Sequence, residues 1–152
     1  MTFLRAAPDG GKPGSGIESP QYAALCYRTS RRAIEVLLIT SRDTRRWVIP
    51  KGWPMAGLPP EETAAREAFE EAGVKGKITG DALGTYGYLK RLPDDQMLPC
   101  RVQVFPLRVS RMSNDFPEKG QRRLKWFKPA AAAKKVQEAE LQAILSGFKP
   151  PD

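Results

Sequence analysis

The residues of this sequence best suited to chemistry are three glutamates on one expected helix. Glu67, Glu70 and Glu71 occupy positions i, i+3 and i+4 of the stretch 61–72, which contains no helix breaker. Side chains at that spacing share a helical face, where each pair of like charges costs about 0.2–0.5 kcal/mol. Arg66 can pair with Glu70, which leaves two carboxylates without a local partner. One interpretation is a solvated acidic face; the other is a bound divalent cation, because hard oxygen ligands select magnesium or manganese.

The residues around the glutamates favour the cation. Pro59 and Pro60 suit a helix entry, and Gly73 supplies the usual stop. Small side chains recur at every fourth position and would let the helix pack closely on a sheet: Ala64, Ala68 and Ala72. The segment 50–52, Pro-Lys-Gly, follows a strand-like run. The loop before the helix can therefore fold its backbone over the carboxylates.

These residues also form a recognisable motif. Residues 66–74, Arg-Glu-Ala-Phe-Glu-Glu-Ala-Gly-Val, reproduce the core of the Nudix box, and Gly52 stands at the first glycine of that box. The motif is long and fixed in spacing, so the chain resembles the Nudix hydrolases. One position departs from it, because Leu58 replaces the glutamate expected six residues after Gly52. The resemblance implies an α/β fold, an α/β/α sandwich with a mixed β-sheet, and magnesium as cofactor with manganese as the alternative.

The similarity extends from about residue 22 to residue 148 and looks like the diphosphoinositol polyphosphate phosphohydrolase branch. The segments that carry it are 23–28, 36–39, 41–42, 46–50, 70–77 and 125–128. That branch cleaves diphosphate bonds in diphosphoinositol polyphosphates and, in many members, dinucleoside polyphosphates. Two departures argue against the inositol substrate. Basic residues before the first strand are missing, and a Pro-Lys-Gly-Trp turn replaces a glycine-rich one.

The resemblance assigns roles residue by residue. The implied metal ligands are Glu67, Glu71, Glu70 and the backbone carbonyl of Lys51 or Gly52. Glu70 is a ligand or the general base, the three glutamates act as one unit, and Arg66 orients them. The implied contacts with substrate phosphates are Thr40, Ser41, Arg42, Lys90, Arg91 and Arg122. The implied partner is a polyphosphorylated small molecule.

Composition narrows the function further. The 152 residues are enough for one domain, and the formal charge of +8 with a pI near 9.7 predicts polyanionic partners. The chain contains no histidine, which excludes Ser-His-Asp catalysis and His-ligated zinc. Cys26 and Cys100 lie in apolar runs and are expected to be buried thiols. No apolar run reaches the ~18 residues of a membrane span, so we expect a cytoplasmic protein, as a monomer or small homo-oligomer.

The hydrophobic pattern alternates between strands and helices. It predicts strands over 22–27, 34–39, 47–49, 82–89, 101–109 and 124–127, and helical structure over 129–148. The first two strands should form a hairpin, and 74–78 should be a connection. Pro106 predicts an edge strand or a bulge. Residues 1–20 are expected to be a flexible arm, and 21–149 a single Nudix domain.

Three functions stay open at this point. The leading one is a diphosphohydrolase, for which Trp53, Tyr86 or Tyr88 could stack on a base. A second is a non-catalytic Nudix-fold module that binds polyanions or RNA. It is motivated by Leu58 and by a basic run: Arg122, Arg123, Lys125, Lys128, Lys134 and Lys135. A third is removal of pyrophosphate from RNA 5′ ends.

Overall fold

The computed structural model describes residues 17–151, and a mixed β-sheet forms its centre. The strands are β2 (Ser19–Ser30), β3 (Ala33–Thr40), β4 (Trp47–Val48), β5 (Lys51–Gly52), β6 (Val74–Ile78), β7 (Gly84–Arg91), β8 (Met97–Met112) and β9 (Leu124–Phe127). The main order is β4-β3-β2-β8-β6, while β5 pairs with β2, β7 with β8 and β9 with β3. Only the β2–β8 pairing is parallel within this described part.

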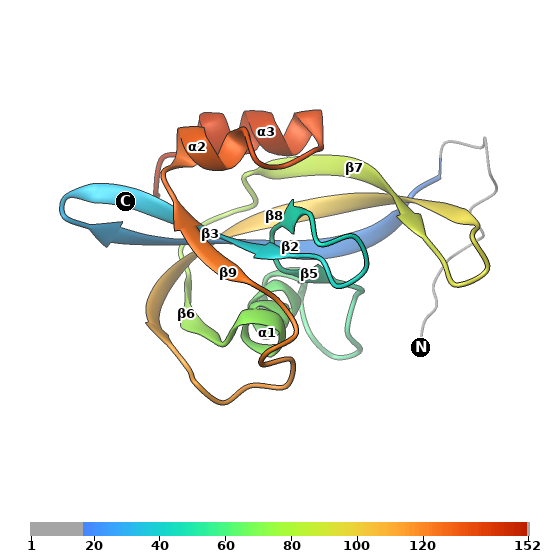
Figure 1. Ribbon diagram of the computed structural model, residues 1–152, viewed down its shortest axis with the longest axis horizontal. Helices are drawn as coiled ribbons and strands as arrows, with labels where there is room; N and C mark the ends of the chain where they lie inside the picture. Colours follow the sequence, from blue (N-terminus) through green and yellow to red (C-terminus); the bar gives the residue numbers. More distant parts are fainter. Residues whose placement is uncertain (1–16, 152) are drawn as a thin grey trace.

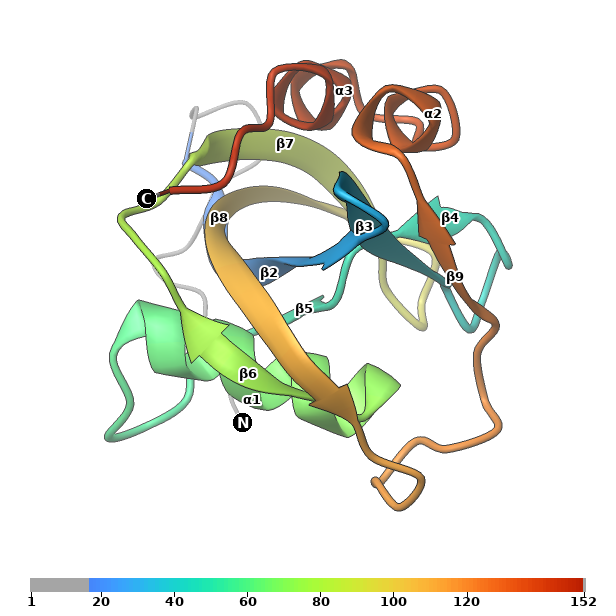
Figure 2. The same ribbon diagram turned by 90° about the vertical axis from the view of Figure 1, so that its left-hand side faces the viewer.

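Helices cover both faces of the sheet. Helix α1 (Pro60–Ala72) lies on one face, and α2 (Pro129–Ala133) and α3 (Ala139–Ser146) lie on the other (Figures 1 and 2). The predicted α/β/α sandwich with a mixed sheet is therefore confirmed. Among residues 17–151, no helix has the length and apolar character needed to cross a membrane.

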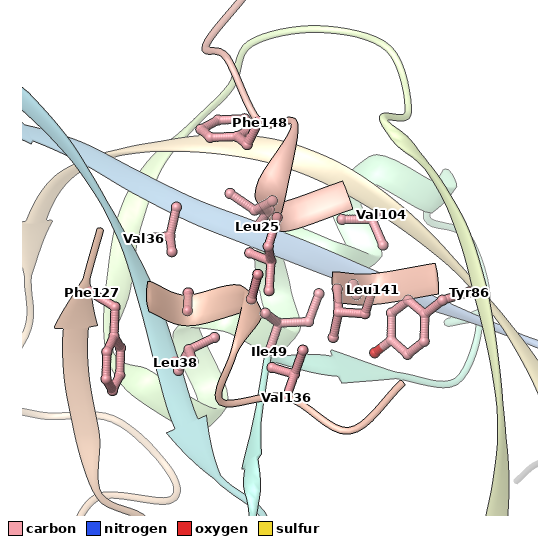
Figure 3. Close-up of a cluster of buried hydrophobic side chains, with 14 of the residues drawn as sticks. Leu25, Val36, Leu38, Ile49, Tyr86, Val104, Phe127, Val136, Leu141 and Phe148 are labelled. Carbon is pink, nitrogen blue, oxygen red and sulfur yellow. The ribbon is translucent and has the colours of Figure 1, made fainter. Parts of the chain in front are cut away.

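Two apolar clusters hold the layers together. The larger lies between the sheet and α2 and α3, and Figure 3 shows Leu141 and Phe148 reaching it from the helical side. Strand β3 contributes to both clusters, because Val36 and Leu38 face α2 and α3 whereas Leu37 and Ile39 face α1. Its nearly continuous apolar sequence follows from this burial on both faces. Cys26 and Cys100 are buried free thiols, as predicted.

Helix α1 packs on the sheet through its small side chains. Ala64, Ala68 and Ala72 are almost fully buried in the second cluster, which confirms the predicted close approach. Gly73 ends the helix in the left-handed region, with φ 72°, and its N–H bonds to the carbonyl of Phe69 at 2.8 Å. This backbone conformation strains any residue that carries a Cβ.

The structure corrects three expectations. Residues 74–78 are not a mere connection; they form β6, paired with the second half of β8. Strand β8 is not an edge, and Pro106 lies where its partner changes from β7 to β6. A missing N–H costs little there, because neither strand pairs with that position. The helical stretch 129–148 divides into α2 and α3, because the chain between them turns inward to bury Val136.

The predicted domain boundary also differs from the observed one. Strand β2 begins at Ser19, inside the segment expected to be a flexible arm. Residues 1–16 of that arm lie outside the described residues.

We expect Gly73→Ala to lower the free energy of unfolding by about 2–4 kcal/mol, combining positive-φ strain with overpacking. A Cβ there would lie 2.6 Å from Phe116 Cδ1 and 2.7 Å from the Ser113 carbonyl oxygen. Gly57→Ala is the matched control: Gly57 has φ 80° but nothing within 4 Å of the added carbon, so only the strain remains. Urea denaturation measures both, and equal losses would contradict the steric part of this account.

Candidate functional site

A cavity of about 1040 Å³ opens beside the N-terminal part of the Nudix-type motif. Its walls come from the loop after β3, from β5 and the loop that follows, from α1 and from the 113–122 loop. Eight residues predicted from the sequence line it: Ser41, Arg42, Lys51, Gly52, Glu67, Glu71, Lys90 and Arg122. The tertiary structure therefore brings most of the predicted site together.

Glu67 and Glu71 form the acidic part of this cavity. They stand one turn apart on the sheet-facing side of α1, and Glu71 is only 7% exposed. Burial, together with the neighbouring carboxylate of Glu71, raises the pKa of Glu67 well above its usual range. Burial also raises the pKa of Glu71, although the neighbouring Glu67 and the Arg122 and Lys51 cations oppose that rise.

Gly52 of β5 lies directly beside the Glu67 carboxylate. It pairs with Tyr22 of β2, so the sheet fixes its position. A Cβ at Gly52 would lie 2.1 Å from Glu67 Oε2. The glycine is therefore needed for space, because the carboxylate occupies the volume that a side chain would fill.

Arg122 connects the acidic pair to its surroundings. Its side chain is 10% exposed and lies 3.8 Å from Glu71 Oε1 and 3.0 Å from Glu118 Oε1. Its Nη1 also donates to the carbonyl oxygen of Thr40, at 3.1 Å. Sequence reasoning missed Glu118, which lies in the irregular 113–122 loop, where no periodic pattern marks an inward-facing residue.

The side chain of Lys51 was also missed, since the motif assigned only its backbone. Its ammonium group lies 4.9 Å from the ring centroid of Tyr88, whose hydroxyl donates to Gln21 at 2.7 Å. Burial lowers the pKa of Lys51 to about 8, and Glu71 partly opposes that shift. A cation thus faces the cavity close to the acidic pair.

The loop after β3 supplies the exposed rim. Arg42 is 55% exposed, donates to Gln121 at 3.0 Å and lies 3.8 Å from Glu118 Oε1. The Ser41 hydroxyl is 2.6 Å from that of Thr44, which fixes the turn of this loop.

Four predicted site residues do not line the cavity. The Thr40 hydroxyl accepts the Arg123 N–H at 2.9 Å, and exposed Arg91 lies 3.9 Å from Asp95. Glu70 is three residues after Glu67 and Glu71 is four, so the Glu70 side chain is rotated around α1 to the other side of Glu67 and does not line the cavity. Its carbonyl accepts the N–H of Glu118.

Arg66 is the fourth of these residues. It lines a separate shallow hollow, together with Leu58, Glu62, Ala65 and Phe69. The expected Arg66–Glu70 ion pair does not form, and Arg66 has no ion pair anywhere in residues 17–151. Leu58, which replaces the motif glutamate, therefore lies next to this arginine and away from the cavity.

The chemistry of the acidic pair fits a divalent cation. Glu71 is buried and lies 3.8 Å from the Arg122 guanidinium group, while the partly buried Glu67 carboxylate occupies the space that the missing side chain of Gly52 leaves. Oxygen ligands of this kind suit magnesium or manganese. Among the described residues, no three carboxylate or thiol groups converge, so the protein itself would supply two carboxylates and backbone oxygens.

Comparison with known proteins gives the family to which this fold and site belong. The NUDIX domain model matches residues 19–146, so the chain belongs to the Nudix family. Mouse diphosphoinositol polyphosphate phosphohydrolase 3-alpha is 36% identical over 121 residues, covering 76% of this chain and 67% of the relative. The human 3-beta protein has the same identity and coverage. The protein is thus a Nudix hydrolase.

Solved structures support the fold. The C. elegans Ap4A hydrolase is 21% identical, has a TM-score of 0.64, and is matched over 86% of this chain and 95% of that one. The NUDIX domain of Shewanella oneidensis NrtR, solved with ADP ribose, is 15% identical with a TM-score of 0.62, over 91% and 92% of the two chains. At these identities the similarity establishes the fold alone.

We expect Glu71→Gln to abolish the rise in melting temperature that Mg²⁺ produces in the parent protein. Saturating metal at ten times its Kd stabilises the fold by about 1.4 kcal/mol, and the variant loses one ligand of the pair. Glu61→Gln is the matched control, because it removes the same charge from the exposed first turn of α1. Thermal unfolding with Mg²⁺ and with EDTA measures the effect, and an undiminished shift in Glu71→Gln would contradict the assignment.

Proposed function

We propose that the protein hydrolyses diphosphate bonds of polyphosphorylated small molecules with Mg²⁺, or alternatively Mn²⁺, as cofactor. One observation carries the proposal: buried Glu71 and partly buried Glu67 share a cavity with four cationic side chains. Glu67, Glu71 and the carbonyl of Lys51 or Gly52 would hold the metal. When bound there, the metal ion neutralises phosphate charge and lowers the pKa of a bound water.

The cationic side chains would bind the phosphates. Arg42 at the rim, with Lys51 and Lys90 deeper in the cavity, can contact successive phosphates of one chain. Arginine donates to phosphate in a bidentate manner, whereas lysine acts as a point charge. A glutamate would accept the proton of the attacking water. The assignment of Glu70 to that role, and of Arg66 to orienting the glutamates, stays a prediction from the motif.

The charge balance of the cavity favours a nucleotide over an inositol substrate. Its lining has four cationic and four acidic side chains: Arg42, Lys51, Lys90 and Arg122 against Asp43, Glu67, Glu71 and Glu118. Arg122 is already paired with two of these carboxylates. An inositol ring with phosphate on every carbon needs cations on all sides, whereas a nucleoside polyphosphate needs them along one chain only.

Part of the cavity lining is apolar. Residues 53–56, Trp-Pro-Met-Ala, contribute this apolar part of the lining, and the partly exposed Trp53 ring packs against no other aromatic ring or cation among residues 17–151. An aromatic ring that lines a phosphate site suits a stacked base. We therefore place dinucleoside polyphosphates first. Diphosphoinositol polyphosphates are the second candidate, because relatives at 36% identity are named for that activity.

A substrate panel tests the function. We expect Mg²⁺-dependent cleavage of dinucleoside polyphosphates to be fastest, with slower cleavage of a diphosphoinositol polyphosphate and of 5′-triphosphorylated RNA. Products are identified by mass, with EDTA as the control for metal dependence. If no substrate is cleaved in the presence of Mg²⁺, the enzymatic proposal fails and a non-catalytic binding module takes its place.

We expect Trp53→Ala to raise KM for dinucleoside polyphosphates about tenfold or more, because base stacking on an aromatic ring contributes about 1–3 kcal/mol. The kcat should change less, since Trp53 is not one of the metal-binding carboxylates. Trp53→Phe keeps a ring and should restore most of the affinity. An equal loss on the inositol substrate would show that Trp53 shapes the loop and does not recognise a base.

A further inference from the structure

Four cations lie outside the cavity on two neighbouring strands, and we call them the β6–β8 tetrad. They are Lys75 and Lys77 on β6 and Arg108 and Arg111 on β8, and all four are exposed. In the antiparallel register, Lys77 lies opposite Arg108 and Lys75 opposite Arg111. Like charges directly opposite one another destabilise a sheet. In the described chain, none of the four has a carboxylate within ion-pair distance.

A β-bulge brings the tetrad to one face of the sheet. The register shifts between Lys75 and Gly76, and Ser110 is the extra residue on β8. Without it, Arg108 and Arg111 would point to opposite faces, because side chains alternate along a strand. The alternate positions face α1: Val74, Ile78, Leu107, Val109 and Met112. A Cβ at Gly76 would lie 2.0 Å from the Arg108 carbonyl oxygen, so the bulge requires glycine there.

The face that carries the tetrad is open. Helices α2 and α3 pack on β3, β9 and β7, and Figure 2 shows them far from β6. Strand β6 lies at the edge of the sheet, and the Lys75 side chain bends round that edge, so its ammonium group lies 5.4 Å from the Phe69 ring centroid on α1. The other three cations of the tetrad start from the open face, and Lys75 extends the charge to its edge. The exposed large apolar side chains in the described chain are Ile17, Leu89, Met97 and Leu124. None of these belongs to β6 or to the second half of β8, so the surface lacks the apolar anchors of a membrane-binding site.

A strained turn adds two cations at the same end of the molecule. Arg31 and Arg32 join β2 to β3 with φ values of 51° and 66°, where Asn-Gly is the usual pair. A residue that carries a Cβ is strained in this region. Strand β2 runs parallel to β8 as far as Tyr27, which lies opposite Arg108. Beyond that pair β8 bends toward β6, and the β2–β3 turn extends at the left of the molecule (Figure 1).

We propose that the tetrad and the Arg31–Arg32 turn bind the phosphodiester backbone of a single-stranded nucleic acid, on a surface separate from the hydrolytic cavity. The two rungs of the tetrad are about 7 Å apart along β6. A chain of phosphates contacts both rungs at once, which a single small anion cannot do. Binding neutralises the opposed like charges, and it is independent of base sequence because the contacts go to the backbone.

The test measures binding of short single-stranded RNA to the full chain by fluorescence anisotropy, in EDTA and over a series of NaCl concentrations. The RNA carries a 5′-hydroxyl, so it offers the cavity no diphosphate. We expect the combined variant Lys75→Gln, Lys77→Gln, Arg108→Gln, Arg111→Gln to bind about tenfold more weakly or worse. The slope of log K against log salt should become shallower by about 3, at about 0.7 per phosphate contact.

The matched control removes the same charge from the basic run noted in the sequence: Lys125→Gln, Lys128→Gln, Lys134→Gln and Lys135→Gln. It should leave RNA binding near the parent level. Lys77→Glu is a second variant that places an ion pair opposite Arg108, so it should weaken binding while keeping the melting temperature of the parent. The same measurement with single-stranded DNA of equal length separates the two sources of phosphodiester. Equal affinity for DNA and RNA shows that the contacts go to the backbone, whereas binding of RNA alone shows a contact to the 2′-hydroxyl group.

Three results would overturn the proposal. They are no RNA binding by the parent at low salt, an equal loss in the control variant, and tetrad-dependent binding of anionic lipid vesicles without RNA binding. Hydrolysis of the small-molecule substrate by the tetrad variant is measured in parallel and should be unchanged. The two functions can therefore fail independently.

Discussion

The rest of the structure depends on the burial of two adjacent carboxylates on one helix. Glu67 and Glu71 repel each other when ionised, and desolvation adds to that cost. The chain accommodates them through contacts that each need a particular residue. Gly52 leaves space beside Glu67, and small alanines allow α1 to lie close to the sheet. This is an arrangement maintained for chemistry, because apolar side chains at both positions would pack at lower electrostatic cost.

Arg122 makes the carboxylate pair part of the wider fold. It contacts Glu71 on α1, Glu118 on the 113–122 loop and the Thr40 carbonyl at the end of β3. Three segments distant in sequence are thus joined at one guanidinium group. The backbone of the same loop bonds to α1, through Glu118 N–H to the Glu70 carbonyl and Ser113 N–H to the Gly73 carbonyl. Helix α1 therefore positions the 113–122 loop, and Arg122 of this loop lies beside the negative charge of Glu71 on the same helix.

Charge is distributed unevenly between cavity and surface. The cavity lining is balanced before any metal binds, so the formal excess of +8 resides elsewhere. The β6–β8 tetrad and the Arg31–Arg32 turn concentrate part of that excess at one end of the molecule. A nearly neutral cavity suits a substrate that brings its own metal-neutralised phosphates. A strand surface whose cations have no carboxylate partners suits a polyanion, because the polyanion releases its bound counterions when it binds there.

The sequence by itself determined the family, the sandwich and the helix of the acidic residues, because the motif, the alanine spacing and the glycine stop are all local. It also pointed to cavity-lining residues: Glu67 and Glu71 follow from the register of the motif, and Arg42 and Lys90 from the wider family resemblance. Only the tertiary structure decided that Glu70 and Arg66 point elsewhere and that Glu118 and the Lys51 side chain enter the cavity. It also decided that residues 74–78 form a strand whose bulge gathers four cations. The physical reason is the same in each case: helical rotation, strand pairing and loop placement set where a side chain points, and these depend on contacts between distant segments.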